Sequence, residues 1–134
     1  MTLIVCVEDR GGMAFFGRRV SRDRAVTEQI LQLPGGSLRM AAYSRSLFPQ
    51  EAAVCADDDF SETAAPGDRC FLELCDPAPW LEKAQQIVLF RWNRTYPYDL
   101  RFPMEQLKNW QLVSSREFCG HSHERITQEV YRKC

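Results

Sequence analysis

The sequence predicts an α/β fold in which a twisted, mostly parallel sheet carries helices on both faces and ends in an antiparallel hairpin. Three observations support this prediction. Strand-like and helix-like segments alternate from residue 3 to residue 92. The first apolar run, residues 3–7, is continuous and rich in β-branched side chains, as expected of a strand covered on both faces. Two strand-length segments, 110–118 and 124–133, follow at the end and predict a closing hairpin.

The individual elements follow from local patterns. The glycine-containing segment 8–19 reads as a long loop. A helix is expected over 21–33, because Ser21 can cap it, an apolar stripe runs along one side, and the Pro-Gly-Gly of residues 34–36 ends it. The other expected elements are a strand at 37–42, a helical turn at 43–48, strands at 52–56 and 69–74, a helix at 78–84 and a strand at 86–92.

Length and charge restrict the classes of function. The 134 residues predict a single domain over 1–134. A formal net charge of −1 offers no general attraction to nucleic acid or to anionic lipid, so we expect neither as a partner. The short apolar run at the N-terminus lacks the basic flank and the length of a signal peptide or membrane span, which predicts a cytoplasmic protein. A homodimer is left open.

The six cysteines are expected to be thiols, because nothing in the sequence indicates export to an oxidising compartment. Cys6 and Cys70 lie inside apolar, strand-like runs and are expected to be small core residues. Cys134 ends the sequence and is expected to be exposed.

Residues 84–103, AQQIVLFRWNRTYPYDLRFP, resemble the dihydrofolate reductase family, whose chains have a strand here and then a loop ending in Asp-x-x-Phe-Pro. Asp99, Phe102 and Pro103 stand at those places. The resemblance extends to a strand that starts near Trp110, to the N-terminal TLIVCVEDRGGM, and to SLRMAAYSRSLF, so it covers nearly the whole chain. It implies a dihydrofolate reductase-like fold and a ligand cleft.

The same resemblance bears on a candidate metal site at Cys119, His121 and His123, which fall two residues apart, as zinc ligands on one side of a strand would. The family has Ser-His at the start of its last strand, which places this segment at the tip of the closing hairpin, with its histidines at the surface or edge. The His-x-His pair is also a fragment of the signature of zinc ribonucleases, but Arg125 stands where their aspartate would. The chain has only two histidines, so we expect no metal and disfavour a zinc ribonuclease.

Applied to individual positions, the resemblance implies a small set of site residues. Asp23 is the counterpart of the family's pterin-binding carboxylate and the catalytic candidate; Glu28 is a poorer one. Alternatively, Asp23 is simply an acid at a helix N-terminus. Ser44, with Arg45 in part, is the candidate for holding cofactor phosphate. The expected cleft, besides Asp23, is lined by Val5, Cys6, Tyr43 and Phe90.

Several of the family's functional positions differ here. The sequence AAYS at 41–44 replaces Gly-Arg-x-Thr, and Glu73-Leu74 falls near the expected Gly-Gly, where a side chain would block phosphate and a carboxylate would repel it. Phe90 replaces a threonine. Four arginines, Arg18, Arg19, Arg22 and Arg24, crowd before the first helix, either as a solvated loop or as a receptor for an anion.

Three hypotheses for function remain. The first is a divergent dihydrofolate reductase-like protein that lacks the ordinary reductase activity and binds a different small molecule in the ancestral cleft, with NADPH disfavoured as cofactor. The second is an NADPH-dependent oxidoreductase acting on a pterin or flavin-pathway heterocycle. The third is a non-enzymatic interaction protein that uses the aromatic and basic stretch 90–102 as its contact surface.

Overall fold

A computed structural model describes residues 1–134. It contains ten strands, three short α-helices and two 3₁₀-helices. In chain order they are β1 (Thr2–Val7), β2 (Gly12–Phe15), β3 (Arg18–Arg19), α1 (Arg24–Gln32), β4 (Leu38–Met40), η1 (Ala42–Leu47), β5 (Val54–Ala56), α2 (Phe60–Thr63), β6 (Arg69–Phe71), α3 (Ala78–Leu81), β7 (Gln86–Arg91), β8 (Leu100–Arg101), η2 (Met104–Asn109), β9 (Trp110–Phe118) and β10 (Ile126–Lys133).

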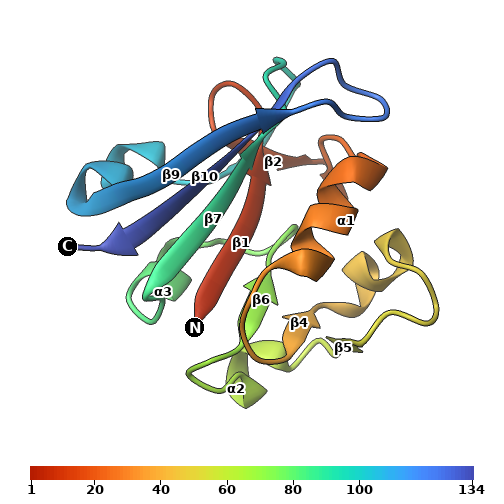
Figure 1. The fold of residues 1–134 in the computed structure, drawn as a ribbon, viewed down its shortest axis with the longest axis vertical. Helices are drawn as coiled ribbons and strands as arrows, with labels where there is room; N and C mark the ends of the chain where they lie inside the picture. Colours follow the sequence, from red (N-terminus) through yellow and green to blue (C-terminus); the bar gives the residue numbers. More distant parts are fainter.

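The main sheet has seven strands in the order β5-β4-β6-β1-β7-β10-β9 (Figure 1). β1 lies in the middle and pairs in parallel with both β6 and β7. β10 pairs antiparallel with β7 and with β9, so the closing hairpin forms one edge of the sheet. The predicted α/β fold, with a mixed sheet and a C-terminal antiparallel hairpin, is confirmed.

Two apolar cores lie on opposite faces of this sheet, because successive side chains of a strand point in opposite directions. On one face, Val26 and Ile30 of α1 pack over Ile4 and Phe90. On the other, Phe60 of α2 and Trp80 of α3 stack with ring centroids 5.1 Å apart, in the core that also contains Leu3 and Val5. Both faces of β1 are therefore covered, as its continuous apolar run predicts.

The segment 8–19 is not the long loop that its glycines suggest. β2 and β3 form a small hairpin there, and β2 also pairs with the distant β8 to give a second, three-stranded sheet. Gly12 permits this arrangement, because a Cβ at that position would lie 2.6 Å from the Tyr98 ring. The partner strand is 86 residues away along the chain, so no local pattern signals the pairing.

The start of α1 also differs from the prediction. The helix begins at Arg24, and its N-cap is Asp23, whose side chain accepts a hydrogen bond from the backbone N–H of Ala25. Ser21 lies outside the helix. Both residue types are good caps, and the choice is decided by a second set of contacts that Asp23 makes with the β9–β10 loop.

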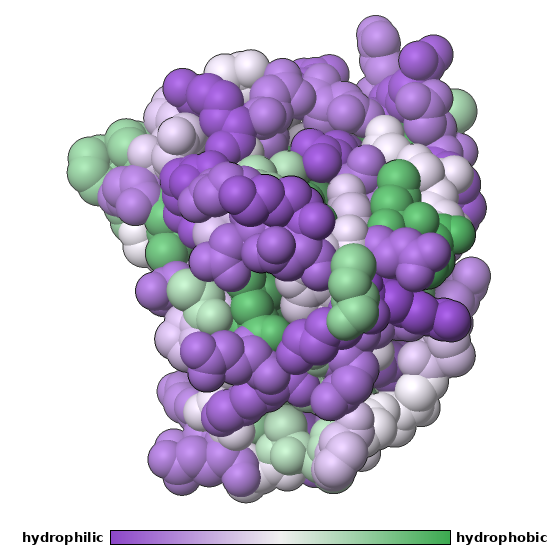
Figure 2. Space-filling view, turned by 90° about the vertical axis from the view of Figure 1, so that its left-hand side faces the viewer, coloured by the Kyte–Doolittle hydropathy of each residue, from purple (hydrophilic) through white to green (hydrophobic).

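The β9–β10 loop reaches over to the N-terminal end of α1, and the two segments lie side by side at the top of the molecule (Figure 1). β9 is the outer strand of this edge and is exposed along most of its length. The side of the molecule that carries it is mostly hydrophilic, with apolar residues in small separate groups (Figure 2). Leu112 and Val113 are the large apolar side chains that β9 exposes.

All six cysteines are free thiols, with Cys70 buried in the core and Cys134 exposed, as expected. Cys6, expected in the core, is half-buried and packs against the core that contains α1. No helix in the structure has the length and apolar character needed to cross a lipid bilayer.

Candidate functional site

A crevice at the carboxyl ends of β1 and β6 is where a ligand site is expected in this topology. The connection after β1 runs over the face that carries α1, whereas the connection after β6 runs over the face that carries α3. In open α/β sheets, ligands bind beside the carboxyl ends of two adjacent strands whose following connections run to opposite faces of the sheet. Cys6 lies near the carboxyl end of β1, and Glu73 lies just after β6.

Side chains of the protein itself fill this crevice. Glu73 accepts two hydrogen bonds from Arg19, at 2.7 Å from Nε and 3.0 Å from Nη2, and a third from Ser44 Oγ at 2.7 Å. Arg19 also lies over the Tyr43 ring, 4.3 Å from its centroid. The remaining cavity beside Cys6 has about 10 Å³ for solvent, which is room for about one water molecule. It is lined by Cys6, Ser21, Arg22, Asp23, Val26, Thr27, Leu47, Phe71, Glu73 and Trp92.

The Cys6 thiol is not suited to act as a nucleophile. Burial, and next the Glu73 carboxylate, raise its pKa well above the usual range. The thiol therefore stays protonated, and the reactive thiolate is not formed near neutral pH.

Asp23 borders the same cavity, but its carboxylate is fully engaged. Oδ1 accepts from the backbone N–H of Ala25 and of His121, each at 2.9 Å. Oδ2 accepts from the backbone N–H of Ser122 at 2.8 Å and of His123 at 3.2 Å, and lies 2.9 Å from His123 Nδ1. Burial by itself would raise the pKa of the carboxyl, but these hydrogen bonds hold the pKa well below its ordinary value.

His123 is a buried residue, so the expectation that it lies at the surface or edge of the hairpin is wrong. Its Nε2 lies 2.9 Å from Ser21 Oγ and 3.1 Å from the Tyr96 hydroxyl. The imidazole stacks on the indole of Trp92, with ring centroids 4.7 Å apart and planes inclined by 25°. The loop can approach Asp23 this closely because residue 120 is glycine: a Cβ there would lie 2.5 Å from Asp23 Oδ2.

The sequence-predicted site residues fall into separate places. Cys6 and Asp23 border the small cavity, and Phe90 is fully buried in the core under α1. Val5 lies in the core on the opposite face of the sheet from Phe90. Tyr43 lines a neighbouring groove.

The candidate phosphate-holding residues are also engaged. Ser44 donates to Glu73, and Arg45 turns away to donate to the backbone carbonyls of Phe48, Pro49 and Gln50. Sequence reasoning gave no role in the site to His123 and Tyr96 and treated Ser21 only as a helix cap. Their contacts join positions 27 to 102 residues apart, and no local spacing signals such a contact.

The neighbouring groove lies between η1 and the segment that follows β6. It offers about 300 Å³ of solvent space, and its lining combines apolar side chains with two carboxylates. Asp58, part of the acidic run 57–59, and Glu73 supply these carboxylates. The lining residues are Ala41, Tyr43, Ser44, Asp58, Phe60, Phe71, Glu73, Leu74 and Cys75.

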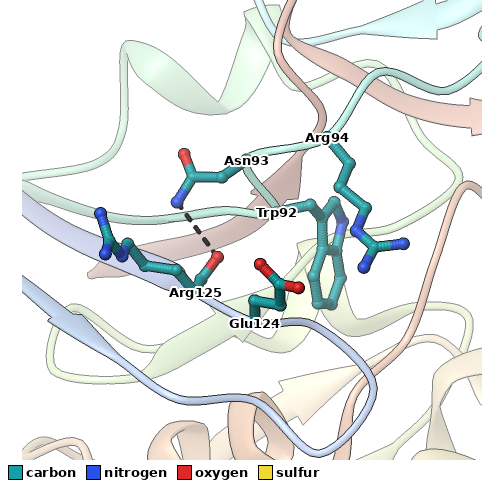
Figure 3. Close-up of a pocket in the computed structure, with 5 residues that line it drawn as sticks. All are labelled: Trp92, Asn93, Arg94, Glu124 and Arg125. Atoms are coloured by element: carbon teal, nitrogen blue, oxygen red, sulfur yellow. Dashed lines mark hydrogen bonds between the residues drawn. The ribbon is translucent and has the colours of Figure 1, made fainter.

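A second recess, of about 390 Å³, lies beside Trp92 (Figure 3). The connection after β7 supplies Asn93 and Arg94, and the β9–β10 loop supplies Glu124 and Arg125. Asn93 Nδ2 donates to the Arg125 carbonyl and joins the two walls (Figure 3). This recess is polar and open, with Trp92 as its single apolar surface.

No three His, Cys, Asp or Glu side chains come together in a way that could hold a metal ion. The aromatic residues of the stretch 90–102 are also largely unavailable at the surface, because Phe90, Trp92 and Phe102 are buried.

Comparison with known proteins identifies the fold. No protein-family model and no curated protein matches the sequence. Among solved structures, dihydrofolate reductase from Enterococcus faecalis, in complex with NADP(H) and RAB-propyl, superposes with a TM-score of 0.71 at 10% sequence identity. The alignment covers 98% of this chain and 95% of that enzyme. The chain therefore has a dihydrofolate reductase-like fold over nearly its full length.

Proposed function

We propose that this protein is a non-reductase version of the dihydrofolate reductase-like fold that binds a small, amine-bearing organic molecule in the groove between η1 and the end of β6. One observation carries the proposal: the Arg19–Glu73–Ser44 network occupies the crevice between β1 and β6. The groove beside it keeps enough space for a small ligand.

The residues present do not fit NADPH. A dinucleotide phosphate needs free backbone amides, cationic side chains or hydroxyl donors. Here the carboxylate of Glu73 stands in the crevice, Ser44 is committed to that carboxylate, and Arg45 is committed to backbone carbonyls. The space beside Cys6 is also too small for a pterin ring.

The chemistry of the groove indicates the class of ligand. Its lining includes Phe60 and Phe71, which favour a ligand with an apolar body. Asp58 lies at the groove within an exposed acidic run, where its Oδ1 accepts a hydrogen bond from the backbone N–H of Ala42 and no cationic side chain pairs with it, whereas the Glu73 charge is already balanced by Arg19. The remaining negative charge favours a ligand that carries an amine.

NMR can test this proposal with amine-bearing aromatic fragments of about ten to fifteen non-hydrogen atoms. We expect saturable shifts of the backbone amides of Tyr43, Ser44 and Leu74, which weaken in Asp58→Asn. The matched control is Asp99→Asn, which removes an exposed carboxylate that accepts a hydrogen bond from the backbone N–H of Phe16, outside the groove. Fragments that shift no groove amides, or whose binding is equal in both variants, would contradict the proposed site.

A further inference from the structure

Ser21, His123 and Asp23 form a continuous line of hydrogen bonds. Ser21 Oγ lies 2.9 Å from His123 Nε2, and His123 Nδ1 lies 2.9 Å from Asp23 Oδ2. This is the order of nucleophile, general base and orienting carboxylate that activates a serine for acyl transfer. We propose that Ser21 is the nucleophile of a hydrolytic site that cleaves compact acyl compounds with an anionic leaving group. The proposal is independent of the groove beside η1.

The surroundings of His123 fix the roles of its two nitrogens. The Asp23 carboxylate is an acceptor that remains ionised, because hydrogen bonds hold its pKa well below the usual range despite burial. Nδ1 therefore carries the proton and donates it to Asp23, which leaves the Nε2 lone pair directed at Ser21. The face of Trp92, 4.7 Å away, stabilises the positive charge that the ring gains when it accepts the serine proton.

Tyr96 is the group that competes with Ser21. Its hydroxyl lies 3.1 Å from His123 Nε2 and 3.4 Å from Ser21 Oγ. A neutral imidazole has a single acceptor nitrogen, so only one of the two hydroxyls can donate to it at a time. Ser21 Oγ, 2.9 Å from Nε2, is in position to give its proton to His123, and when Tyr96 takes that place Ser21 donates to the Tyr96 oxygen instead.

The space around Ser21 determines the kind of substrate. Ser21 is half-buried, and the small cavity beside it holds about one water molecule, so only a compact acyl group that approaches from the exposed side of the serine can reach Oγ. Arg22 and Arg24 are exposed, have no ion-pair partner, and line a further recess of about 80 Å³ next to it. The backbone N–H groups of Arg22 and Arg24 have no acceptor within the protein and stay free to donate; the Asp23 carboxylate lines the same recess.

The reaction balances without any cofactor. Ser21 Oγ attacks the acyl carbon while its proton passes to His123 Nε2, and the resulting imidazolium is stabilised by Asp23. The bond from the acyl carbon to the leaving oxygen then breaks. A basic leaving group takes the proton from His123 as it departs, whereas a weakly basic one departs as an anion and His123 releases its proton to solvent, so that Nε2 is free again in both cases. Water, deprotonated by His123, hydrolyses the acyl-serine and restores the free hydroxyl.

A compact serine reagent tests the nucleophile directly. Methanesulfonyl fluoride should form a bond from sulfur to Ser21 Oγ with release of fluoride, and peptide mass spectrometry should locate the label at Ser21. Ser21→Ala should abolish labelling, and His123→Gln should slow it by about 100-fold or more. Ser115→Ala, which removes an exposed serine of β9, is the matched control and should label as the unchanged protein does.

Ser21→Ala keeps the Asp23–His123 pair, so it tests the proposal even if His123→Gln does not fold. Tyr96→Phe removes the competing hydroxyl and should raise the labelling rate. Absence of labelling in the unchanged protein would overturn the proposal. So would a label on Tyr96, or labelling at Ser21 that a folded His123→Gln variant retains at full rate.

The substrate class has its own test, which compares hydrolysis of acetyl phosphate with that of p-nitrophenyl acetate. Arg22→Gln should raise the KM for acetyl phosphate by about two- to fivefold more than the KM for the neutral ester, as expected for one exposed charge contact. Equal changes for the two compounds would refute recognition of an anion. Failure to hydrolyse either compound would refute the hydrolytic step.

Discussion

Replacement of Asp23 by asparagine changes the contact between the β9–β10 loop and the start of α1. Oδ1 accepts two hydrogen bonds, from the backbone N–H groups of Ala25 and His121. Oδ2 accepts from the backbone of Ser122 and from both the backbone and the ring of His123. An amide has one acceptor oxygen in place of two, so in either orientation at least two of these donors lose their acceptor and face an NH₂ group.

The expected loss of stability follows from the number of contacts. Hydrogen bonds to a charged group contribute about 1.5–3 kcal/mol each. Loss of two therefore lowers the free energy of unfolding by about 3–6 kcal/mol. For a chain of 134 residues the entropy of unfolding is roughly 0.3 kcal/mol/K, so the Tm should fall by about 10 °C or more.

Urea denaturation followed by tryptophan fluorescence measures this difference. Asp76→Asn is the matched control, because the exposed Asp76 carboxylate accepts one local hydrogen bond, from the backbone N–H of Ala78 at 3.0 Å. It should cost no more than about 1 kcal/mol. If Asp23→Asn cost less than about 1 kcal/mol, or stabilised the protein, Asp23 would not join the loop to α1 as described.

Three further predictions concern the hydrogen bonds of Asp23 and the Arg19–Glu73–Ser44 network. The pKa of Asp23 is lower in the folded state, so its contribution to stability is present above the unfolded pKa of about 3.9 and is lost as the pH falls below that value. The difference in unfolding free energy between the unchanged protein and Asp23→Asn should therefore shrink between pH 6 and pH 2, and a constant difference would contradict this. Gly120→Ala should destabilise by about 1–3 kcal/mol, because its Cβ would lie 2.5 Å from Asp23 Oδ2, whereas Gly67→Ala meets no atom within 4 Å and should be near neutral by the same denaturation assay. Glu73→Leu leaves the Arg19 charge unpaired and should cost about 3 kcal/mol, most of which the additional change Arg19→Leu should restore; a double-mutant cycle without coupling would refute the network.

Much of the fold could be predicted because hydrophobic periodicity is a local signal. The continuous apolar run at 3–7 identified a central strand, and the two segments after residue 109 identified the edge hairpin. The order of motifs along 84–103 supplied the resemblance to the fold, although the identity to the solved enzyme is only 10%. Packing of both faces of β1 then follows from its composition.

The errors share a physical cause, which is contact between residues far apart in the chain. β2 pairs with β8, so the glycines of that segment gave a misleading signal of a loop. Ser21 and Asp23 are equally good caps by type, and the β9–β10 loop selects Asp23. His123 is buried because Asp23 and Ser21 hold both of its nitrogens, and neither contact can be inferred from the local sequence.

The central claim is that the Arg19–Glu73–Ser44 network closes the crevice to NADPH, and a thermal-shift titration with NADPH tests it most directly. A ligand present at 100 times its Kd stabilises a fold by about 2.7 kcal/mol, which would raise the Tm of this chain by roughly 10 °C. At millimolar NADPH we predict a rise in Tm of no more than about 1–2 °C, which by the same relation corresponds to a Kd near or above that concentration. We also predict no oxidation of NADPH when dihydrofolate is added. A saturable rise near 10 °C accompanied by turnover would show that the crevice opens and that the protein is a reductase.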